Sequence, residues 1–467
     1  MSERKQISLI LALIPLVTLV GCLFVSLNIL DAGPHIPIVF STAVAAIIAI
    51  CSGYKWGEIE KYILETMASS LQAITILLIV GALIGTWILS GVVPTMIYYG
   101  LMIISPKVFL LISCVLCSIV SLATGSSWST AGTVGIALMG IGRTMGIPLP
   151  LVAGSIISGA YFGDKMSPLS DTTNMAPAVA GSELFEHIKH MVYTVTPSLL
   201  ITLVIYTILG FRYGGNNIDP TDINEMMTLL ADKFAITPIL LIPPILVIVM
   251  VVIQIPSIPG LFAGAFLGAV FAMIIQGTGL ADVINASFSG FNSQTGNEMV
   301  DSLLSSGGMS SMAWTITLIF VAMAFGGVVQ KTGMLDVIID KALAAAKSTG
   351  SLILATLLTC IAVNILTASQ YLSIVITGNM FRERYIERGL HPKNLSRCLE
   401  DAGTVTSPLI PWNNCGAFMA STLGVSAFAY APFAFFCYIT PIVSAIYGYT
   451  GFSIEKLPGK SSQTQAS

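Results

Sequence analysis

The chain has 467 residues, of which 55% are hydrophobic and only 9% are charged, and its mean hydropathy is +0.88. This composition excludes a soluble globular protein, and no nucleic-acid partner is expected. The net charge of −3 says little, because in a membrane protein the side on which the basic residues fall matters more than their sum. We therefore expect an all-α polytopic protein whose main surroundings are a lipid bilayer.

Apolar runs recur along almost the whole chain, and a hydrocarbon core of ~30 Å needs ~20 such residues in a helix. In chain order these runs predict membrane helices at residues 7–30, 36–51, 71–89, 191–210, 234–253, 261–275, 314–329 and 432–449. The first run lacks a clear small-residue cleavage site, so we expect a retained helix rather than a signal peptide. Eight cysteines lie scattered through apolar segments and no histidine spacing suits zinc or haem, so no cofactor is expected.

Two apolar segments, residues 107–143 and 351–381, are interrupted by polar residues. The interruptions read TGSSWST at residues 124–130 and TASQY at residues 367–371. Each flank is short for a full crossing, which predicts re-entrant hairpins with polar tips. Unsatisfied backbone at that depth is costly unless it faces protein or a wet cavity, so the tips should line a site. The alternative is a pair of kinked helices whose hydroxyls bond back to their own carbonyls.

A second polar break follows each hairpin. It reads GDKMSPLSDTTN at residues 163–174 and DAGTVTSPLIPWNN at residues 401–414. Proline and glycine at these points predict unwound helices with free carbonyl groups. A hard cation such as Na⁺ prefers the oxygen ligands in which both stretches are rich.

The chain can also be aligned with itself. An identical residue occurs 242 positions after each of Thr75, Ala82, Gly85 and Gly91. With an offset of 243 positions, the same holds for Thr124, Ser126, Gly146, Pro168 and Gly181. This predicts one repeat over residues 7–212, an extracytoplasmic linker at 213–233, a second repeat over 234–450 and a cytoplasmic tail at 451–467.

The basic residues predict the orientation of these repeats. Threading from a cytoplasmic N-terminus places 15 of the 20 Lys and Arg residues inside and four outside, with Lys165 left within the membrane. The two repeats then start on opposite sides of the membrane. Inverted repeats of this kind are common in secondary carriers, which bind substrate near the middle of the bilayer, and they suggest a scaffold domain plus a transport domain.

Asp171 is the leading candidate for a cation and proton site, because desolvation can raise the pKa of a carboxyl until H⁺ and Na⁺ compete for it. The alternative role for Asp171 is to cap a helix that begins near Thr172. Asp164 and Lys165 could form a fixed ion pair, or Lys165 could pair with another acid and release its proton as Na⁺ enters. The other candidate ligands near these residues are Thr172, Thr173, Asn174, Thr124, Ser126 and Ser127.

The second repeat has Ser407 and Asn414 where the first has Asp164 and Asp171, so the charge is unequally divided. Its acids are Glu400 and Asp401, which lie close to a basic run at residues 382–397 that we expect to be solvated or lipid-facing. The candidate site residues of this half are Asn413, Asn414, Thr367, Ser369, Asp401 and Ser407.

The segment GDKMSPLSDTTN at residues 163–174, together with TGSSWSTAGT at residues 124–133, resembles the NhaC-type sodium/proton antiporters along essentially the whole chain. The resemblance implies two inverted repeats, an elevator-like movement, and a role for Asp164, Asp171 and nearby hydroxyls in handling Na⁺ and H⁺. It also implies a bacterial-type inner-membrane location with both termini cytoplasmic, and a homodimer. Members that exchange malate with protons for lactate with sodium, or that carry amino acids, keep an organic anion or amino acid open as a partner.

Two other classes of function remain as alternatives. A channel would favour a continuous polar path rather than two inverted breaks. A membrane-embedded hydrolase would need a nucleophile beside a base, for which Lys165 and Ser167 are the only candidates. We expect a carrier and no enzyme.

Overall fold

The computed structural model describes residues 7–457 except for residues 31, 214–219, 254, 295–296, 298–299 and 302–303. The described chain is helical almost throughout, and its β-structure is limited to isolated bridges such as Leu390 with Lys456. Within the described residues, seven helices are long and apolar enough to cross a membrane, or nine if each of two bent pairs counts as one span. The prediction of an all-α polytopic membrane protein is confirmed.

The helices of the first half begin at Leu9 and end at Tyr213. They are α1 (Leu9–Asn28), α2 (His35–Cys51), α3 (Trp56–Ser69), α4 (Leu71–Leu89), α5 (Val92–Ile103), η1 (Pro106–Val108), α6 (Phe109–Thr124), α7 (Ser127–Thr130), the π-helical η2 (Ala131–Gly135), α8 (Ile136–Thr144), α9 (Leu149–Met166), α10 (Asp171–Ala180) and α11 (Leu184–Tyr213).

The remaining helices include two more irregular turns at the second break. They are α12 (Pro220–Lys233), η3 (Pro238–Leu241), α13 (Ile242–Val252), α14 (Ser257–Ile275), α15 (Leu280–Ser289), η4 (Met309–Met312), α17 (Ala313–Lys331), α18 (Met334–Ala345), α19 (Thr349–Thr367), α20 (Gln370–Glu387), α21 (Pro392–Cys398), the π-helical η5 (Leu399–Thr404), η6 (Ser407–Leu409), α22 (Asn414–Leu423), α23 (Ala427–Tyr430), η7 (Ala431–Phe433) and α24 (Phe435–Thr450).

Each predicted apolar run lies on helical structure, but two details differ. The run at residues 234–253 is not one helix, because η3 precedes α13 and a 96° bend separates this pair from the end of α12. The predicted linker at 213–233 contains the helix α12, while residues 214–219 lie outside the described part of the chain.

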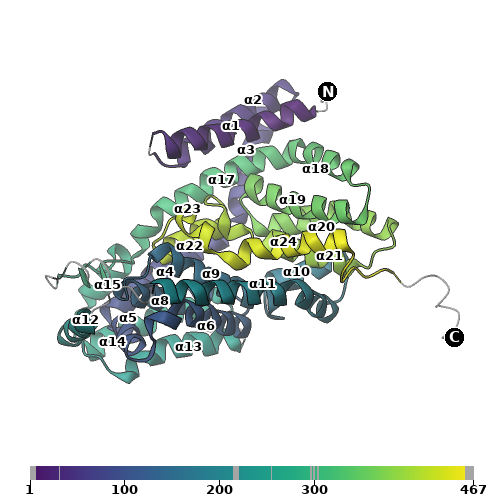
Figure 1. Ribbon diagram of the computed structural model, residues 1–467. Helices are drawn as coiled ribbons and strands as arrows, with labels where there is room; N and C mark the ends of the chain where they lie inside the picture. The colour runs from purple at the N-terminus through teal and green to yellow at the C-terminus, as the bar shows by residue number, and fades with distance from the viewer. Residues whose placement is uncertain are drawn as a thin grey trace.

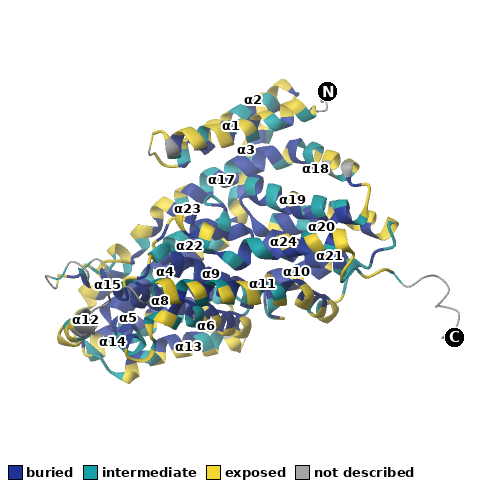
Figure 2. Ribbon diagram, in the orientation of Figure 1, coloured by how far each residue is buried: buried dark blue, intermediate teal, exposed yellow. Residues whose placement is uncertain are grey.

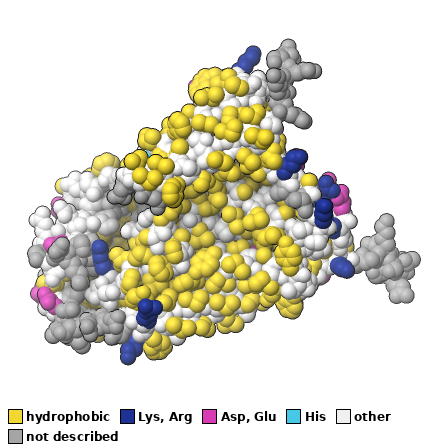
Figure 3. All heavy atoms as spheres, turned by 45° about the horizontal axis from the view of Figure 1, so that its top comes forward, with side chains coloured by type: hydrophobic (Ala, Val, Ile, Leu, Met, Phe, Trp, Pro, Cys, Tyr) yellow, Lys and Arg dark blue, Asp and Glu magenta, His cyan; other side chains and the backbone are white. Residues whose placement is uncertain are grey.

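The helices divide into a lipid-facing set and an internal set (Figures 1 and 2). Only 28% of the residues in the apolar stretch of α1 are buried, as in α11 and α14, whereas 67% are buried in the span Met309–Lys331. In Figure 1, α1 and α2 lie together at one side of the molecule, where they contact α17 and α18. Figure 3 shows hydrophobic side chains over most of one face, with the charged side chains toward its margins. This surface suits contact with lipid.

Small residues allow close packing in the middle of α4, as their spacing predicts. A Cβ added to Gly81 would lie 2.6 Å from the carbonyl oxygen of Gly308, and one added to Gly85 would lie 2.1 Å from that of Ala286. Both distances are well inside van der Waals contact. The small-xxx-small pattern at Gly81 and Gly85 therefore serves packing between α4, α15 and the segment before η4.

Both interrupted segments fold back on themselves. In the second, the Thr356 hydroxyl lies 3.0 Å from the Tyr385 hydroxyl, and the Ser373 hydroxyl donates to the Cys360 carbonyl at 2.8 Å, so α19 and α20 run antiparallel. In the first, the ring of Phe109 near the start of α6 packs against Gly142 near the end of α8. The expectation of short flanks was wrong, however, for the flank before each tip, because the spans Pro106–Thr124 and Thr349–Thr367 each have 19 residues.

The helix bounds follow the predicted internal repeat. Helices α4 and α17 have the same length at an offset of 242 residues, as do α5 and α18, and α10 and α22 match at an offset of 243. The left-handed residues Gly91 and Gly333 precede α5 and α18, and Gly181 and Gly424 follow α10 and α22. The opposite orientation of the two repeats stays a prediction.

Candidate functional site

The two unwound segments meet in the interior of the protein. Helix α9 ends at Met166, a turn at residues 167–170 follows, and α10 begins at Asp171. In the second half the π-helical turn η5 leads through η6 to α22. Both α9 and α10 contact η5. The ring of Trp128 on α7 stacks on that of Phe418 on α22, with centroids 4.2 Å apart, which joins the first hairpin to the second break.

Asp164 is buried near the end of α9 and is held by the tip of the first hairpin. Its carboxylate accepts hydrogen bonds from the backbone N–H of Ser127 at 3.0 Å, from the Ser127 hydroxyl at 2.6 Å, and from the Ser170 hydroxyl at 2.5 Å. These are short, charge-assisted contacts that favour an ionised carboxylate. Ser127 was predicted as a site residue, and the structure shows how it reaches Asp164.

The hydroxyls after the break stabilise the unwound backbone. Thr173 donates to the carbonyl oxygens of Asp164 at 3.1 Å and Lys165 at 2.9 Å, which α9 leaves free where it ends. The hydroxyl of Thr172 is buried 3.2 Å from that of Ser170. Asn174 is exposed, and its amide donates to the carbonyl oxygens of residues 168 and 170, which is a structural contact.

Asp171 is exposed at the first position of α10. It does not cap the helix, because Ser170 is the N-cap and accepts from the Thr173 N–H, so the alternative role considered for Asp171 is corrected. It remains close enough to Asp164 and to Tyr371 to interact with both electrostatically. The desolvation expected for Asp171 is found at Asp164 instead.

Lys165 forms an ion pair with Asp401 of η5 across the two halves, and neither side chain is exposed. Asp401 also accepts a hydrogen bond from the Thr194 hydroxyl at 2.9 Å. The possibility that Lys165 pairs with an acid other than its neighbour Asp164 is therefore the arrangement found. The pair links the first break to the second, although the two residues are 236 positions apart in the sequence.

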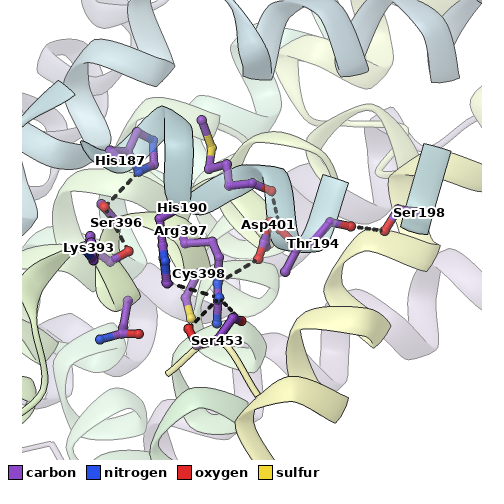
Figure 4. Close-up of polar contacts among 12 residues, drawn as sticks. His187, His190, Thr194, Ser198, Lys393, Ser396, Arg397, Cys398, Asp401 and Ser453 are labelled. Atoms are coloured by element: carbon purple, nitrogen blue, oxygen red, sulfur yellow. Dashed lines mark hydrogen bonds and ion pairs between the residues drawn. The ribbon is translucent and has the colours of Figure 1, made fainter. Parts of the chain in front are cut away.

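Arg397 extends this network to His190 of α11 and to Ser453, which follows α24 (Figure 4). Its Nε lies 3.7 Å from Asp401 Oδ2, and its Nη1 donates to His190 Nε2 at 3.1 Å and to the Ser453 hydroxyl at 2.7 Å. Because a guanidinium only donates, His190 must accept through an unprotonated Nε2 and is neutral. Arg397 is completely buried, so the expectation that the whole basic run at 382–397 is solvated was wrong at this residue.

The predicted residues of the second half mostly hold the backbone of their break. Asn413 caps α22 and donates to Asn364, Ser369 caps α20, and Thr367 bonds back to the Val363 carbonyl. Ser407 donates to the carbonyl of Thr404 at 2.6 Å and lies 3.2 Å from Gln370 Oε1.

Three other predicted residues complete the two tips. Asn414 donates its backbone N–H to the Ala368 carbonyl, while its side-chain oxygen is buried without a hydrogen-bond partner among the described residues. In the first tip, Ser126 caps α7, and Thr124 bonds weakly back to Ser121. Each of these contacts lies beside a break, and Asn414 has an oxygen free for a ligand.

Sequence reasoning missed three residues of the cluster, Arg397, His190 and Thr194. It named Glu400 as an acid of the second half but did not include it among the candidate site residues. Arg397 lies four residues before Asp401, and His190 four residues before Thr194, which are spacings that place side chains on one helix face. Only the contact between α11 and α21 shows that the two faces meet.

The buried charges do not balance. Among the described residues, the buried acidic and basic side chains other than the histidines His187 and His190 are Asp164, Lys165, Arg397, Glu400 and Asp401. Three are acids and two are bases, so the fully ionised cluster carries one excess negative charge. An isolated charge in a low-dielectric interior is costly, so a proton or a bound cation would be needed to neutralise the cluster.

Comparison with known proteins agrees with this chemistry. A family model described as the Na⁺/H⁺ antiporter family matches residues 159–452, which include both breaks and the entire buried cluster. The chain belongs to the Na⁺/H⁺ antiporter family. A "Na(+)/H(+) antiporter NhaC" from Alkalihalophilus pseudofirmus is 40% identical over 456 residues, covering 97% of this chain and 98% of the relative.

Other members of the Na⁺/H⁺ antiporter family carry different names. A "Malate-2H(+)/Na(+)-lactate antiporter" from Bacillus subtilis is 41% identical over 90% of each chain, and an "Arginine/ornithine antiporter ArcD" from Halobacterium salinarum is 38% identical over 97% of this chain and 96% of the relative. A solved structure of Neisseria gonorrhoeae MtrF, whose title places it in a class of antimetabolite efflux pumps, has a TM-score of 0.39 at 13% identity, covers 92% of this chain and 97% of its own, and is too distant to bear on the site.

Proposed function

We propose that this protein is a secondary active carrier that exchanges Na⁺ for H⁺ across a bacterial-type inner membrane. The observation that carries the proposal is the buried cluster of three acids and two bases at the meeting point of the two helix breaks. One monovalent cation neutralises this cluster, and Na⁺ and H⁺ can each supply that charge. Mutually exclusive binding, combined with alternating access, yields exchange.

The candidate cation site surrounds Asp164 and the first break. Asp164, Ser127 and Ser170 supply carboxylate and hydroxyl oxygens, and Thr172 adds another hydroxyl. These are the hard ligands that Na⁺ prefers. Asp171 lies at the exposed edge of this group, where its charge attracts cations to the site.

The pair of Lys165 and Asp401 is suited to couple the two halves of the carrier. Lys165 belongs to the first half and Asp401 to the second. A movement that separates the two breaks would break this ion pair, whereas a movement of both breaks together would preserve it. We infer an elevator-like movement in which inverted repeats form a scaffold and a transport domain, with cytoplasmic termini and a homodimer as the assembly.

A cavity of about 510 Å³ leads to the second break on the side that we assign to the extracytoplasmic surface. It is lined by Pro411 of the break, by Trp314 and Thr315 of α17, by Ser426 and Phe428 of α23, and by residues before α2. No lining residue is charged. The cavity therefore offers no cationic partner for the carboxylate of an organic acid.

A second candidate function is Na⁺-coupled exchange of an organic acid or an amino acid. It is favoured by the names of the relatives from Bacillus subtilis and Halobacterium salinarum. The volume of the cavity is large enough for such a solute. We give it second place because the buried basic groups, Lys165 and Arg397, are already paired.

Purified protein in proteoliposomes with a pH-sensitive dye inside separates the two functions. External Na⁺ alone should make the interior more alkaline, with choline giving no response. A response that appears only when malate, lactate or arginine is added would contradict simple exchange and establish the second candidate.

A further inference from the structure

Glu400 is a buried acid that the site described so far does not use. It lies in the π-helical turn η5 with no solvent exposure, and neither of its carboxylate oxygens has a hydrogen-bond partner among the described residues. The buried hydroxyl of Thr404, four residues later, is also without a partner. Three unsatisfied oxygens in one turn are costly unless a ligand binds them, and π-helical turns often occur at functional sites.

The surrounding charges assign the excess negative charge of the cluster to Glu400. Asp164 accepts three hydrogen bonds, and Asp401 is paired with Lys165 and approached by Arg397. Glu400 has no equivalent partner. Of the three buried acids, it is the only one with neither a hydrogen bond nor an ion pair among the described residues.

The groups that face Glu400 come from several helices. Asp164 and Lys165 of α9 interact with it electrostatically, and the hydroxyls of Thr172 on α10 and Thr404 lie beside it without good hydrogen-bond geometry. Cys360 of α19 lies within electrostatic range, and Arg397 lies one turn before it. Lys165 disfavours a nearby cation, but its charge is compensated by Asp401.

We propose that Glu400, together with the hydroxyls of Thr404 and Thr172, is a direct ligand of the transported Na⁺. A proton would satisfy only one of the unpartnered oxygens, whereas a metal ion can be coordinated by both carboxylate oxygens and the hydroxyls at once. The assignment rests on the proposed function and adds Glu400 to the candidate cation site around Asp164, with which it interacts electrostatically.

The test compares Glu400→Gln with Glu60→Gln, a matched change at an exposed glutamate of α3. Thermal unfolding of the full-length protein in detergent is measured in choline chloride and in NaCl, and binding of ²²Na⁺ is measured at equilibrium. In the wild type and in Glu60→Gln, Na⁺ should raise the Tm, because it binds only the folded state. In Glu400→Gln the Tm in choline should equal or exceed that of the wild type, Na⁺ should add nothing, and Na⁺ affinity should fall at least about 100-fold.

The outcomes separate this inference from the proposed function. A Glu400→Gln variant that responds to Na⁺ like the wild type would overturn the role of Glu400 and leave Na⁺/H⁺ exchange intact. A wild-type protein that does not bind Na⁺ would overturn the exchange function itself.

If Glu400→Gln does not fold, Glu400→Asp keeps the charge and withdraws it by one methylene. We expect that variant to fold and to change its preference between Na⁺ and Li⁺, because the two ions require different ligand distances. Unchanged affinities for both ions would overturn the proposal.

Discussion

The two halves of the molecule build the same break with different chemistry. In the first half, Ser127 of the hairpin donates to Asp164, and in the second half, 243 residues later, Ser407 of the unwound segment lies 3.2 Å from Gln370 of the hairpin. A second contact is also repeated at this offset, since Ser121 donates to the carbonyl of residue 160 as Asn364 does to that of Gly403. The contacts between hairpin and break thus occur at equivalent positions in both halves. The charged residue at this contact, Asp164, is present in the first half only.

This difference separates what the scaffold needs from what the site needs. Neutral hydrogen bonds are sufficient to hold an unwound helix, as the second half demonstrates at Ser407. The buried charges of the second half, Arg397, Glu400 and Asp401, occupy positions that correspond to Gly154, Ile157 and Ser158 in the first. The two halves therefore carry their buried charged residues at positions that are not equivalent. These residues form one cluster because the two breaks lie in contact.

The largest effect is expected at the ion pair between the halves. Lys165→Ala leaves Asp401 buried without its main partner, which should cost about 3–5 kcal/mol of stability and abolish exchange. The combined change Lys165→Met with Asp401→Asn removes both charges and should recover most of the Tm without recovering transport. Thermal unfolding and proteoliposome transport measure the two effects, and a Lys165→Ala protein as stable as the wild type would contradict the pair's role.

A smaller difference is expected between the two equivalent hairpin contacts. Ser127→Ala removes a charge-assisted hydrogen bond to Asp164, worth about 1.5–3 kcal/mol, whereas Gln370→Ala removes a neutral one, worth about 0.5–1.5 kcal/mol. Ser407 also keeps its bond to the Thr404 carbonyl after the second change. The Na⁺ concentration for half-maximal exchange should rise about tenfold in Ser127→Ala and hardly in Gln370→Ala. Equal shifts would mean that the two contacts have the same role.

The smallest effect is expected at Asp171. Because its carboxylate is exposed, Asp171→Asn should leave folding unchanged and raise the half-saturating Na⁺ concentration by no more than about tenfold, with a weaker effect at high salt. Transport rates over a range of Na⁺ and ionic strength measure this. Complete loss of exchange in a folded Asp171→Asn protein would instead make Asp171 the central carboxylate of the site.

The sequence predicts the membrane class and the two breaks, and it singles out Asp164, Lys165 and Asp401, which the structure buries, because apolar runs and intramembrane charges are local signals. The exposure of Asp171 could not be predicted. Capping by Ser170 turns Asp171 to the same outer face of α10 as Asn174, while Thr172 and Thr173 face inward.

Contacts between the halves were also beyond prediction. Lys165 and Asp401 are 236 residues apart, and their pairing depends on the packing of α9 against η5. The burial of Arg397 was missed because it ends a basic run in which Arg382 and Arg384 are exposed and Arg388 is half-buried. The number of basic residues in such a segment does not show which of them faces the protein interior.

The most direct test of the buried cluster as the site of exchange is Na⁺-driven pH change in proteoliposomes containing Asp164→Asn protein, with wild type and Glu60→Gln as references. Asparagine has nearly the shape of aspartate and can still accept from Ser127, so the variant should fold. We predict alkalinisation of the interior in both references and none in Asp164→Asn. Exchange at the wild-type rate with the wild-type pH dependence in Asp164→Asn would contradict the assignment of the exchange to this cluster.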